Sequence, residues 1–258
     1  MQIYIYSEKE SQVHRIHPVV KIVLLLVYFQ MAMTFQHPVY LFSLLIFLLF
    51  LAAIGGALKA IWKFRFVLVV LFTLSFLLWA LFYRGGEPVP GRSFLHFSRD
   101  GLLFGAGMGL RLSSMMIAGI LFLTTTRVES FSHGLNMMGI PYKVSFALTL
   151  AFRLVPLFIE SALTIIEAQR SRGLELEGVN IGKKIKGYIP LIIPVFASSL
   201  RASDNLALAL EARAFGFAEK RTSFIEYSFG MRDSVALLIF LLADTFILAM
   251  RLQGYGVV

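Results

Sequence analysis

The sequence of 258 residues has no cysteine and few charged residues. Without cysteine the chain forms neither a disulfide nor a thiolate metal site. Charged residues make up 15% of the chain and hydrophobic residues 58%, whereas a soluble domain has about 25% charged and about 45–50% apolar residues. This balance is typical of an integral membrane protein. The apolar runs are continuous rather than alternating, so they predict transmembrane helices and not a β-barrel.

Motifs for nucleotide binding and hydrolysis are missing as well. The chain has no G-x-x-x-x-G-K-[ST] phosphate loop, no H-E-x-x-H zinc motif and no G-x-S-x-G nucleophile elbow. Its histidines are scattered and its aspartates form no cluster. We therefore expect no catalytic residue, and no cofactor or metal ion bound by this chain. The net charge of +9 is explained by Lys and Arg on the cytoplasmic side of a membrane, which predicts no nucleic-acid partner.

The long apolar runs predict five membrane-spanning helices. A span needs roughly 20 residues, so the uncharged residues 22–58 hold two helices, with a turn at Gln36-His37-Pro38. Further spans are predicted at residues 66–83, 102–126 and 234–250.

Some residues inside the apolar segments are unusual there. Gly105 and Gly109 form a GxxxG pattern, which permits close packing of a second helix. Asp244 lies in the last predicted span, where a charge is costly unless it is paired or solvated. Arg111 and Arg153 also lie within apolar segments. We interpret both arginines as structural, through hydrogen bonds or snorkelling, with a coupling or substrate-path role as the alternative.

Residues 127–232 differ from the rest, because charges recur every few positions among the apolar residues. We expect a short helix at about residues 129–138 and two long helices at about residues 142–172 and 188–215, with a connecting loop at 178–184. Helices of this kind lie along the inner face of a membrane. Hydropathy alone would make spans of both long helices, which would give six or seven spans.

The predicted fold is an all-α integral membrane protein. It has about five transmembrane helices and a cytoplasmic coupling domain of three amphipathic helices, two of them long. Residues 1–126 form the N-terminal tail and four spans, residues 127–232 the coupling domain, and residues 233–258 the last span and an external C-terminus. With the N-terminus inside, most of the 24 basic residues fall on the cytoplasmic side.

Both long helices are predicted to end in the same local pattern. One ends with Ser171-Arg172-Gly173 and the other with Ala212-Arg213-Ala214, and each reaches a glycine. Glycine is common just past a helix C-terminus, and the helix dipole favours an arginine there. Small neighbours would let another protein's backbone come close. We interpret the two ends as docking sites for partner subunits, with possible structural or coupling roles for the nearby Glu167, Gln169 and Glu211.

An ordered set of short motifs extends along the whole chain. It comprises Ser11-x-x-His14-Arg15-x-x-Pro18-x-x-Lys21, Thr124-Thr125-Thr126, Arg153 with Pro156, Ala168-Gln169-x-x-Arg172-Gly173, and the two arginine triplets. This set resembles the transmembrane T component of energy-coupling factor (ECF) transporters, the family that includes EcfT, CbiQ and BioN. The first triplet departs conservatively from the pattern, since the family usually has Ala-Arg-Gly there.

The resemblance implies a non-catalytic subunit of the cytoplasmic (inner) membrane of a prokaryote. Its partners would be two cytoplasmic ECF ATPases, as a homo- or heterodimer, which bind ATP and Mg, and a membrane S component that binds a vitamin or a metal ion. Arg172 and Arg213 would each pair with acidic groups in a groove of one ATPase. Through these ends the chain would couple ATP hydrolysis to movement of the S component.

Three other interpretations remain open. A permease subunit of a conventional ABC importer has a docking loop whose start fits Glu167-Ala168-Gln169-x-x-x-Gly173. In such permeases an apolar element with a proline should follow the glycine of the loop. Here Pro190 and Pro194 lie too far after Gly173 to fit it. A membrane-embedded enzyme would need Asp244, Arg111 and Arg153 to converge. A membrane-surface scaffold without a transport role is the third.

Overall fold

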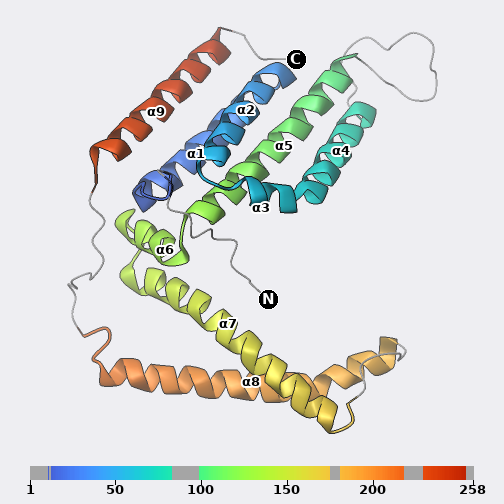
Figure 1. Ribbon diagram of the computed structural model, residues 1–258, viewed down its shortest axis with the longest axis vertical. Helices are drawn as coiled ribbons and strands as arrows, with labels where there is room; N and C mark the ends of the chain where they lie inside the picture. The colour runs from blue at the N-terminus through green and yellow to red at the C-terminus, as the bar shows by residue number, and fades with distance from the viewer. Residues whose placement is uncertain (1–10, 12, 83–98, 175–180, 218–228, 254–258) are drawn as a thin grey trace. The chain divides into compact units, whose positions relative to one another are not determined.

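The computed structural model describes residues 11, 13–82, 99–174, 181–217 and 229–253 (Figure 1). These residues contain helices and no strand, so the protein is an all-α membrane protein, as predicted. Most of the predicted N-terminal tail and the end of the predicted external C-terminus lie outside the described residues. The helices are α1 (Pro18–Thr34), α2 (Pro38–Ile54), α3 (Leu58–Lys63), α4 (Arg65–Phe82), α5 (Arg99–Thr125), α6 (Val128–Met137), α7 (Tyr142–Ser171), α8 (Ile181–Ala212) and α9 (Met231–Leu252).

Helices occur at all five predicted spans, namely α1, α2, α4, α5 and α9. By length and composition, α4, α5 and α9 can cross a membrane, and so can α7. The apolar helices α1 and α2 have 17 residues each, or roughly 25 Å at 1.5 Å per residue, which is near the lower limit for a span. Both begin with a His-Pro pair, in which the histidine ring accepts from the backbone N–H two residues on.

The described chain packs as two compact units, divided at Ser145 and Tyr227. Helix α6, which the sequence assigned to the coupling domain of residues 127–232, packs on α1 and belongs to the first unit. Its contact with α1 is close, because a Cβ atom at Gly134 would lie 3.2 Å from the Cβ atom of Pro18.

Helix α5 is the centre of the first unit, and in Figure 1 it lies between α2 and α4. The predicted close packing at the GxxxG pattern is observed against α4. A Cβ atom at Gly105 would lie 2.9 Å from the carbonyl oxygen of Phe76, and one at Gly109 would lie 3.1 Å from that of Phe72. Gly107 points to the α1–α2 turn instead, where a Cβ atom would collide with the carbonyl oxygen of Gln36.

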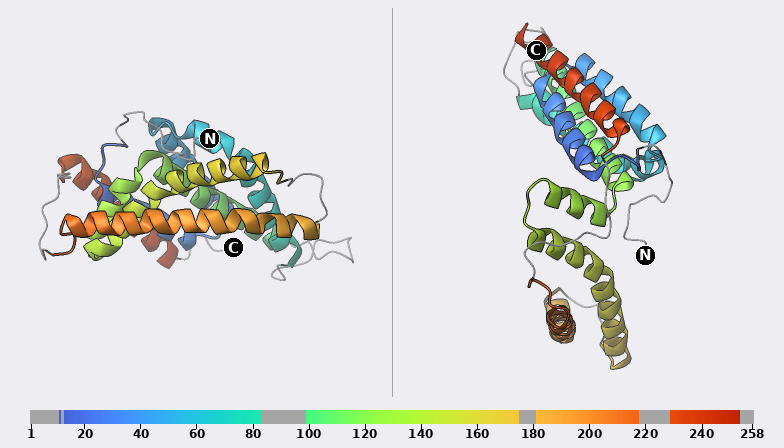
Figure 2. Two further views of the ribbon diagram at one scale, coloured as in Figure 1. Left: turned by 90° about the horizontal axis from the view of Figure 1, so that it is seen from below. Right: turned by 90° about the vertical axis from the view of Figure 1, so that its left-hand side faces the viewer.

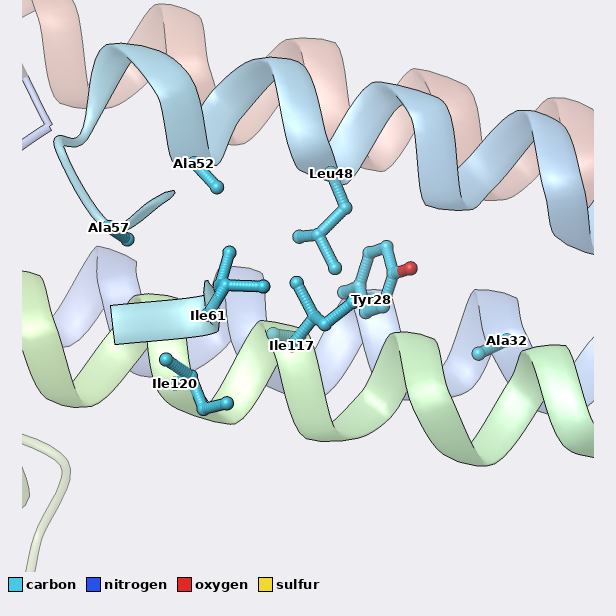
Figure 3. Packing of buried hydrophobic residues seen from close by; sticks show 9 residues of the cluster. Tyr28, Ala32, Leu48, Ala52, Ala57, Ile61, Ile117 and Ile120 are labelled. Atoms are coloured by element: carbon cyan, nitrogen blue, oxygen red, sulfur yellow. The ribbon is translucent and has the colours of Figure 1, made fainter. Parts of the chain in front are cut away.

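The apolar core of the first unit is formed by α1, α2, α3 and α5 (Figure 3). The side chains of Tyr28, Leu48 and Ile117 meet between the helices, and Ile61 of α3 lies over Ile120 of α5. The short helix α3 was not among the predicted helices. It forms because Ala57 and Ile61 are buried in this core.

The second unit is built from α7 and α8, the two long helices in Figures 1 and 2. Phe146, near the start of α7, packs on Phe215 just after α8, with ring centroids 4.3 Å apart. Further along, the hydroxyl groups of Ser161 and Ser198 lie 3.2 Å apart. From the first contact to the second, the residue number rises from 146 to 161 in α7 and falls from 215 to 198 along α8 and the turn after it, so the two helices run in opposite directions.

The prediction that α8 starts near residue 188, after a loop at residues 178–184, was wrong. The helix begins at Ile181 and continues through Pro190 and Pro194. A proline costs a helix the hydrogen bond to the carbonyl four residues earlier. Because Pro194 is four residues after Pro190, both lie on one face, and the bond lost at Pro194 is the one that would have used the carbonyl of Pro190.

Candidate functional site

The C-terminal end of α7 is closed by a Schellman turn. The N–H of Gly173 donates to the carbonyl of Arg170 at 3.0 Å, and the N–H of Leu174 donates to the carbonyl of Gln169 at 3.0 Å. Gly173 has φ of +89°, the left-handed conformation that this motif requires and that glycine adopts without steric cost. Arg172 is therefore the C-cap residue, at the negative end of the helix dipole.

The end of α8 has the same geometry with a different residue in the left-handed position. The N–H of Ala214 donates to the carbonyl of Glu211 at 2.8 Å, and the N–H of Phe215 donates to the carbonyl of Leu210 at 2.9 Å. Ala214 has φ of +54°, and it is the one described residue other than glycine with positive φ. Arg213 thus occupies the C-cap position of α8, as Arg172 does in α7. The closing residue is Ala214, and Gly216 follows two residues later.

All six residues of the two triplets are exposed: Ser171, Arg172, Gly173, Ala212, Arg213 and Ala214. The hydroxyl of Ser171 donates to the carbonyl of Glu167 within the last turn of α7, at 3.1 Å. Neither arginine forms an ion pair or a hydrogen bond through its guanidinium to another part of the described chain. Both guanidinium groups are therefore available to a partner.

The two ends lie far apart within the second unit. Because α7 and α8 are antiparallel, the C-terminus of α7 lies at one end of the pair and the C-terminus of α8 at the other (Figure 1). Between Phe146 and Arg172 the helix rises roughly 40 Å at 1.5 Å per residue. The site is therefore two equivalent surfaces and not one shared pocket.

The other predicted residues of this region support or flank the ends. Gln169 provides the carbonyl that accepts from both Arg172 and Leu174. Glu167 and Glu211 are exposed, and each contributes a backbone carbonyl to its helix end. Arg153 is exposed in the middle of α7, close in sequence to neither end.

Arg111 lies in the first unit, where it binds the C-terminal end of α1. Its Nε donates to the carbonyl of Ala32 at 3.0 Å, and its Nη2 donates to the carbonyl of Phe35. Carbonyl groups at a helix C-terminus have no partner within the helix. A buried cation that satisfies them is also favoured by the helix dipole, so Arg111 joins α5 to α1.

Two further buried charges occupy helix ends in the same unit. The Nζ of Lys21 donates to the carbonyl of Thr125, the last residue of α5, at 2.7 Å, and to that of His14 at 3.1 Å. Asp233 accepts from the N–H of His17 at 2.7 Å, just before α1 begins. The cation thus lies at a helix C-terminus and the anion at an N-terminus, as the dipoles favour.

Asp233 was not singled out from the sequence, although Lys21 and Thr125 both belong to the ordered set of motifs described above. Its position one turn into α9, where its carboxylate also accepts from the N–H of Gly230 at 2.9 Å, is the signal that could have indicated a capping residue. Its long-range partner His17 is 216 positions away in sequence, and no local pattern predicts such a contact.

Comparison with known proteins shows the family of the chain. The family model described as CbiQ, cobalt transport protein, matches residues 9–224. The chain belongs to this family. The matched region contains α1 to α8, so it includes both arginine-capped helix ends as well as Lys21, Arg111 and Thr125.

The relatives of this CbiQ-family chain match it over nearly its full length. The energy-coupling factor transporter transmembrane protein EcfT of Bacillus selenitireducens is 29% identical over 265 residues, which cover 96% of each chain. EcfT of Acidaminococcus fermentans is 30% identical over 249 residues, or 92% of this chain and 91% of the relative. EcfT of Thermanaerovibrio acidaminovorans is 32% identical over 246 residues, covering 90% and 89%. The chain is thus a multi-pass transmembrane component of the CbiQ and EcfT type.

Proposed function

We propose that this chain is the energy-coupling subunit of an ECF-type ABC importer. In this role it links ATP hydrolysis by two cytoplasmic ATPases to a membrane S component that takes up a vitamin or a metal ion. The names of its relatives support the assignment, because they describe transmembrane proteins of energy-coupling factor transporters. The chain itself performs no catalysis, and ATP and Mg bind to the partner subunits.

The observation that carries the proposal is the equivalence of the two helix ends. Arg172 and Arg213 have the same C-cap position, both are exposed, and they lie at opposite ends of an antiparallel helix pair. An antiparallel pair has an approximate local two-fold axis. Such an axis matches a dimer of ATPases, whose two subunits offer the same groove twice. Each arginine would bind carboxylates of one ATPase through its planar guanidinium.

The S component would contact the apolar surface of the second unit. Large apolar side chains are exposed along both of its helices, and Ile192, Ile193 and Phe196 of α8 are each more than 60% exposed. An apolar surface of this kind marks an interaction site. When the ATPases close, the helix ends would move with them and would carry this surface along.

Docking can be tested by purification of the tagged complex from its own membranes. Arg172→Ala and Arg213→Ala should each reduce the amount of ATPase that co-purifies, since truncation of one partner of a buried charge pair costs about 2–5 kcal/mol. Arg201→Ala is the matched control, because Arg201 is also exposed on α8 but lies away from its end. If the double variant retains both ATPases and full uptake, the docking function is wrong.

Mass spectrometry should find one copy of this chain for each pair of ATPases.

The proposed orientation places the N-terminus and the second unit in the cytoplasm and the C-terminus outside. Because the chain has no cysteine, single cysteines report on their own position. Asn205→Cys, in α8, should react with an impermeant maleimide only after the cells are permeabilised. Gln253→Cys, after α9, should react in intact cells. The opposite pattern at either residue would contradict this topology.

A further inference from the structure

The corner between α3 and α4 carries three basic and two aromatic side chains on its surface. These are Lys59, Trp62, Lys63, Arg65 and Phe66, here called the basic corner. All five are exposed, Trp62 to 69% and Phe66 to 76%. The guanidinium carbon of Arg65 lies 4.7 Å from the centroid of the Trp62 ring, a cation–π distance that holds the two side chains together.

The basic corner has a fixed position on the first unit. On the opposite side of α3, Ala57 is 1% exposed and Ile61 is 9% exposed, and both pack in the core with α5 (Figure 3). The turn before α3 is equally tight, because a Cβ atom at Gly55 would lie 3.0 Å from Cδ1 of Leu121. The cations are therefore held beside the C-terminal part of α5.

No acidic residue of the surrounding sequence balances these charges. The chain has no Asp or Glu between Glu10 and Glu87, a stretch that includes α1 to α4. Among the described residues, none of the three basic side chains forms an ion pair. The corner is thus a concentrated and exposed positive charge that can attract an anion.

The surface next to the basic corner indicates which class of anion would bind there. Helix α4 is long and apolar enough to cross a membrane, and Phe66, Val69 and Leu74 are exposed along it. The basic corner lies at the end of this apolar surface. Tryptophan and basic residues at the end of a span are typical of the headgroup layer. An acidic protein would leave the adjoining apolar surface and Trp62 uncovered, whereas a phospholipid covers both.

We propose that the basic corner is a binding site for an anionic phospholipid. The lipid phosphate lies against Lys59, Lys63 and Arg65, where the guanidinium of Arg65 can donate two hydrogen bonds to it. The Trp62 ring lies in the interfacial layer beside the headgroup, and the acyl chains run along α4. This site is formed by other residues than the helix ends at which the ATPases are proposed to dock.

The two tryptophans of the chain, Trp62 and Trp79, allow a direct test. Trp79→Phe leaves Trp62 as the single reporter, and phenylalanine preserves the ring contact with Phe104. The full-length variant is reconstituted in bilayers that contain brominated phosphatidylglycerol or brominated phosphatidylcholine with identical acyl chains. We expect Trp62 quenching to show a preference of about fivefold or more for phosphatidylglycerol, the factor expected from about 1 kcal/mol for even one basic residue near an anionic surface.

Three variants of this reporter distinguish lipid binding at the basic corner from a general attraction of anionic lipid to the net positive charge of the protein. Lys59→Gln/Lys63→Gln/Arg65→Gln should abolish the preference, while Lys59→Arg/Lys63→Arg/Arg65→Lys should retain it. Lys143→Gln/Arg201→Gln/Arg232→Gln removes the same charge from exposed positions elsewhere and should also retain it. Circular dichroism establishes that each variant is folded, and Lys63→Gln alone replaces the triple variant if the latter is not.

The parent reporter decides the proposal even without the variants. Equal quenching of Trp62 by the two brominated lipids would overturn it. It would also be overturned if Lys143→Gln/Arg201→Gln/Arg232→Gln lost the preference as fully as the neutral corner variant does. Loss of co-purifying subunits in the neutral corner variant, without any lipid preference in the parent, would overturn it in favour of an acidic protein surface.

Discussion

Gly173 and Ala214 have the same left-handed backbone conformation, each directly after a C-cap arginine. Their φ angles are +89° and +54°, and each donates its N–H to the carbonyl three residues earlier. The turn therefore explains the glycine at position 173, whereas Ala214 adopts the same conformation at a steric cost. For a residue with a Cβ atom this conformation costs roughly 1–2 kcal/mol.

The left-handed positions predict opposite effects of two substitutions. Ala214→Gly should stabilise the end of α8 by about 0.5–1 kcal/mol, because the steric cost of the alanine exceeds the entropy cost of the glycine. Gly173→Ala should destabilise the end of α7 by a similar amount or more. Hydrogen exchange of the peptides that contain residues 214 and 173 measures both effects. If exchange slows or accelerates in the same direction in both variants, the assignment of the two turns is wrong.

Lys21→Met should destabilise the first unit strongly. The substitution removes the Lys21 donor from the carbonyls of His14 and Thr125 and removes a cation that interacts electrostatically with the buried Asp233. Removal of one member of such a buried pair typically costs about 3–5 kcal/mol. Thermal unfolding in detergent should show this loss, whereas Lys143→Met, at an exposed position, should change little.

A double-mutant cycle tests whether Lys21 and Asp233 act together. Asp233→Asn removes the charge but retains an oxygen that can accept from His17. We expect Lys21→Met/Asp233→Asn to be less destabilised than the sum of the two single variants, because the second change removes the uncompensated charge. Strict additivity would show that the two side chains are independent.

Gly107 and Gly119 form a matched pair of glycines within α5. A Cβ atom added at Gly107 would collide with the carbonyl oxygen of Gln36. A Cβ atom added at Gly119 would have no described atom of another element within 4 Å. Gly107→Ala should therefore destabilise the protein by about 1–3 kcal/mol or more through overpacking. Gly119→Ala should be neutral or stabilising by up to about 1 kcal/mol. Unfolding midpoints of both purified variants give the comparison, and similar midpoints would contradict the packing.

Arg111→Lys tests the cap on the C-terminus of α1. Lysine preserves the charge but has no planar fork that can reach the carbonyls of both Ala32 and Phe35. Each lost hydrogen bond to a charged group costs about 1.5–3 kcal/mol. We expect a lower unfolding temperature with retained ATPase co-purification, since Arg111 belongs to the first unit. Loss of the ATPases from an otherwise stable variant would instead indicate a coupling role.

The helices were largely predictable because the apolar runs and their breaks are local features. Apolar runs indicated α1, α2, α4 and α5, and the His37-Pro38 pair indicated the turn between the first two. The predicted start of α8 was wrong by seven residues, because the hydrogen bonds lost at Pro190 and Pro194 are tolerated within a long helix. Helix α3 was missed, since six residues carry too little periodicity and its stability comes from the burial of Ile61.

The candidate docking residues were also indicated by a local pattern. An arginine between small residues at the end of a helix is visible in the sequence, and so is the resemblance that such triplets support. That Ala214, directly after Arg213, is left-handed as well as Gly216 was not visible, because an alanine gives no sign of positive φ.

Composition and local patterns were enough to predict a helical membrane protein without a nucleotide or metal motif. The contacts between buried charges and helix ends could be seen only in the folded chain, because they join residues that are far apart in sequence. Lys21 lies 104 positions from Thr125, and His17 lies 216 positions from Asp233. A charge inside a membrane protein is costly until a partner satisfies it, and here the partners are helix ends that come together only when the chain has folded.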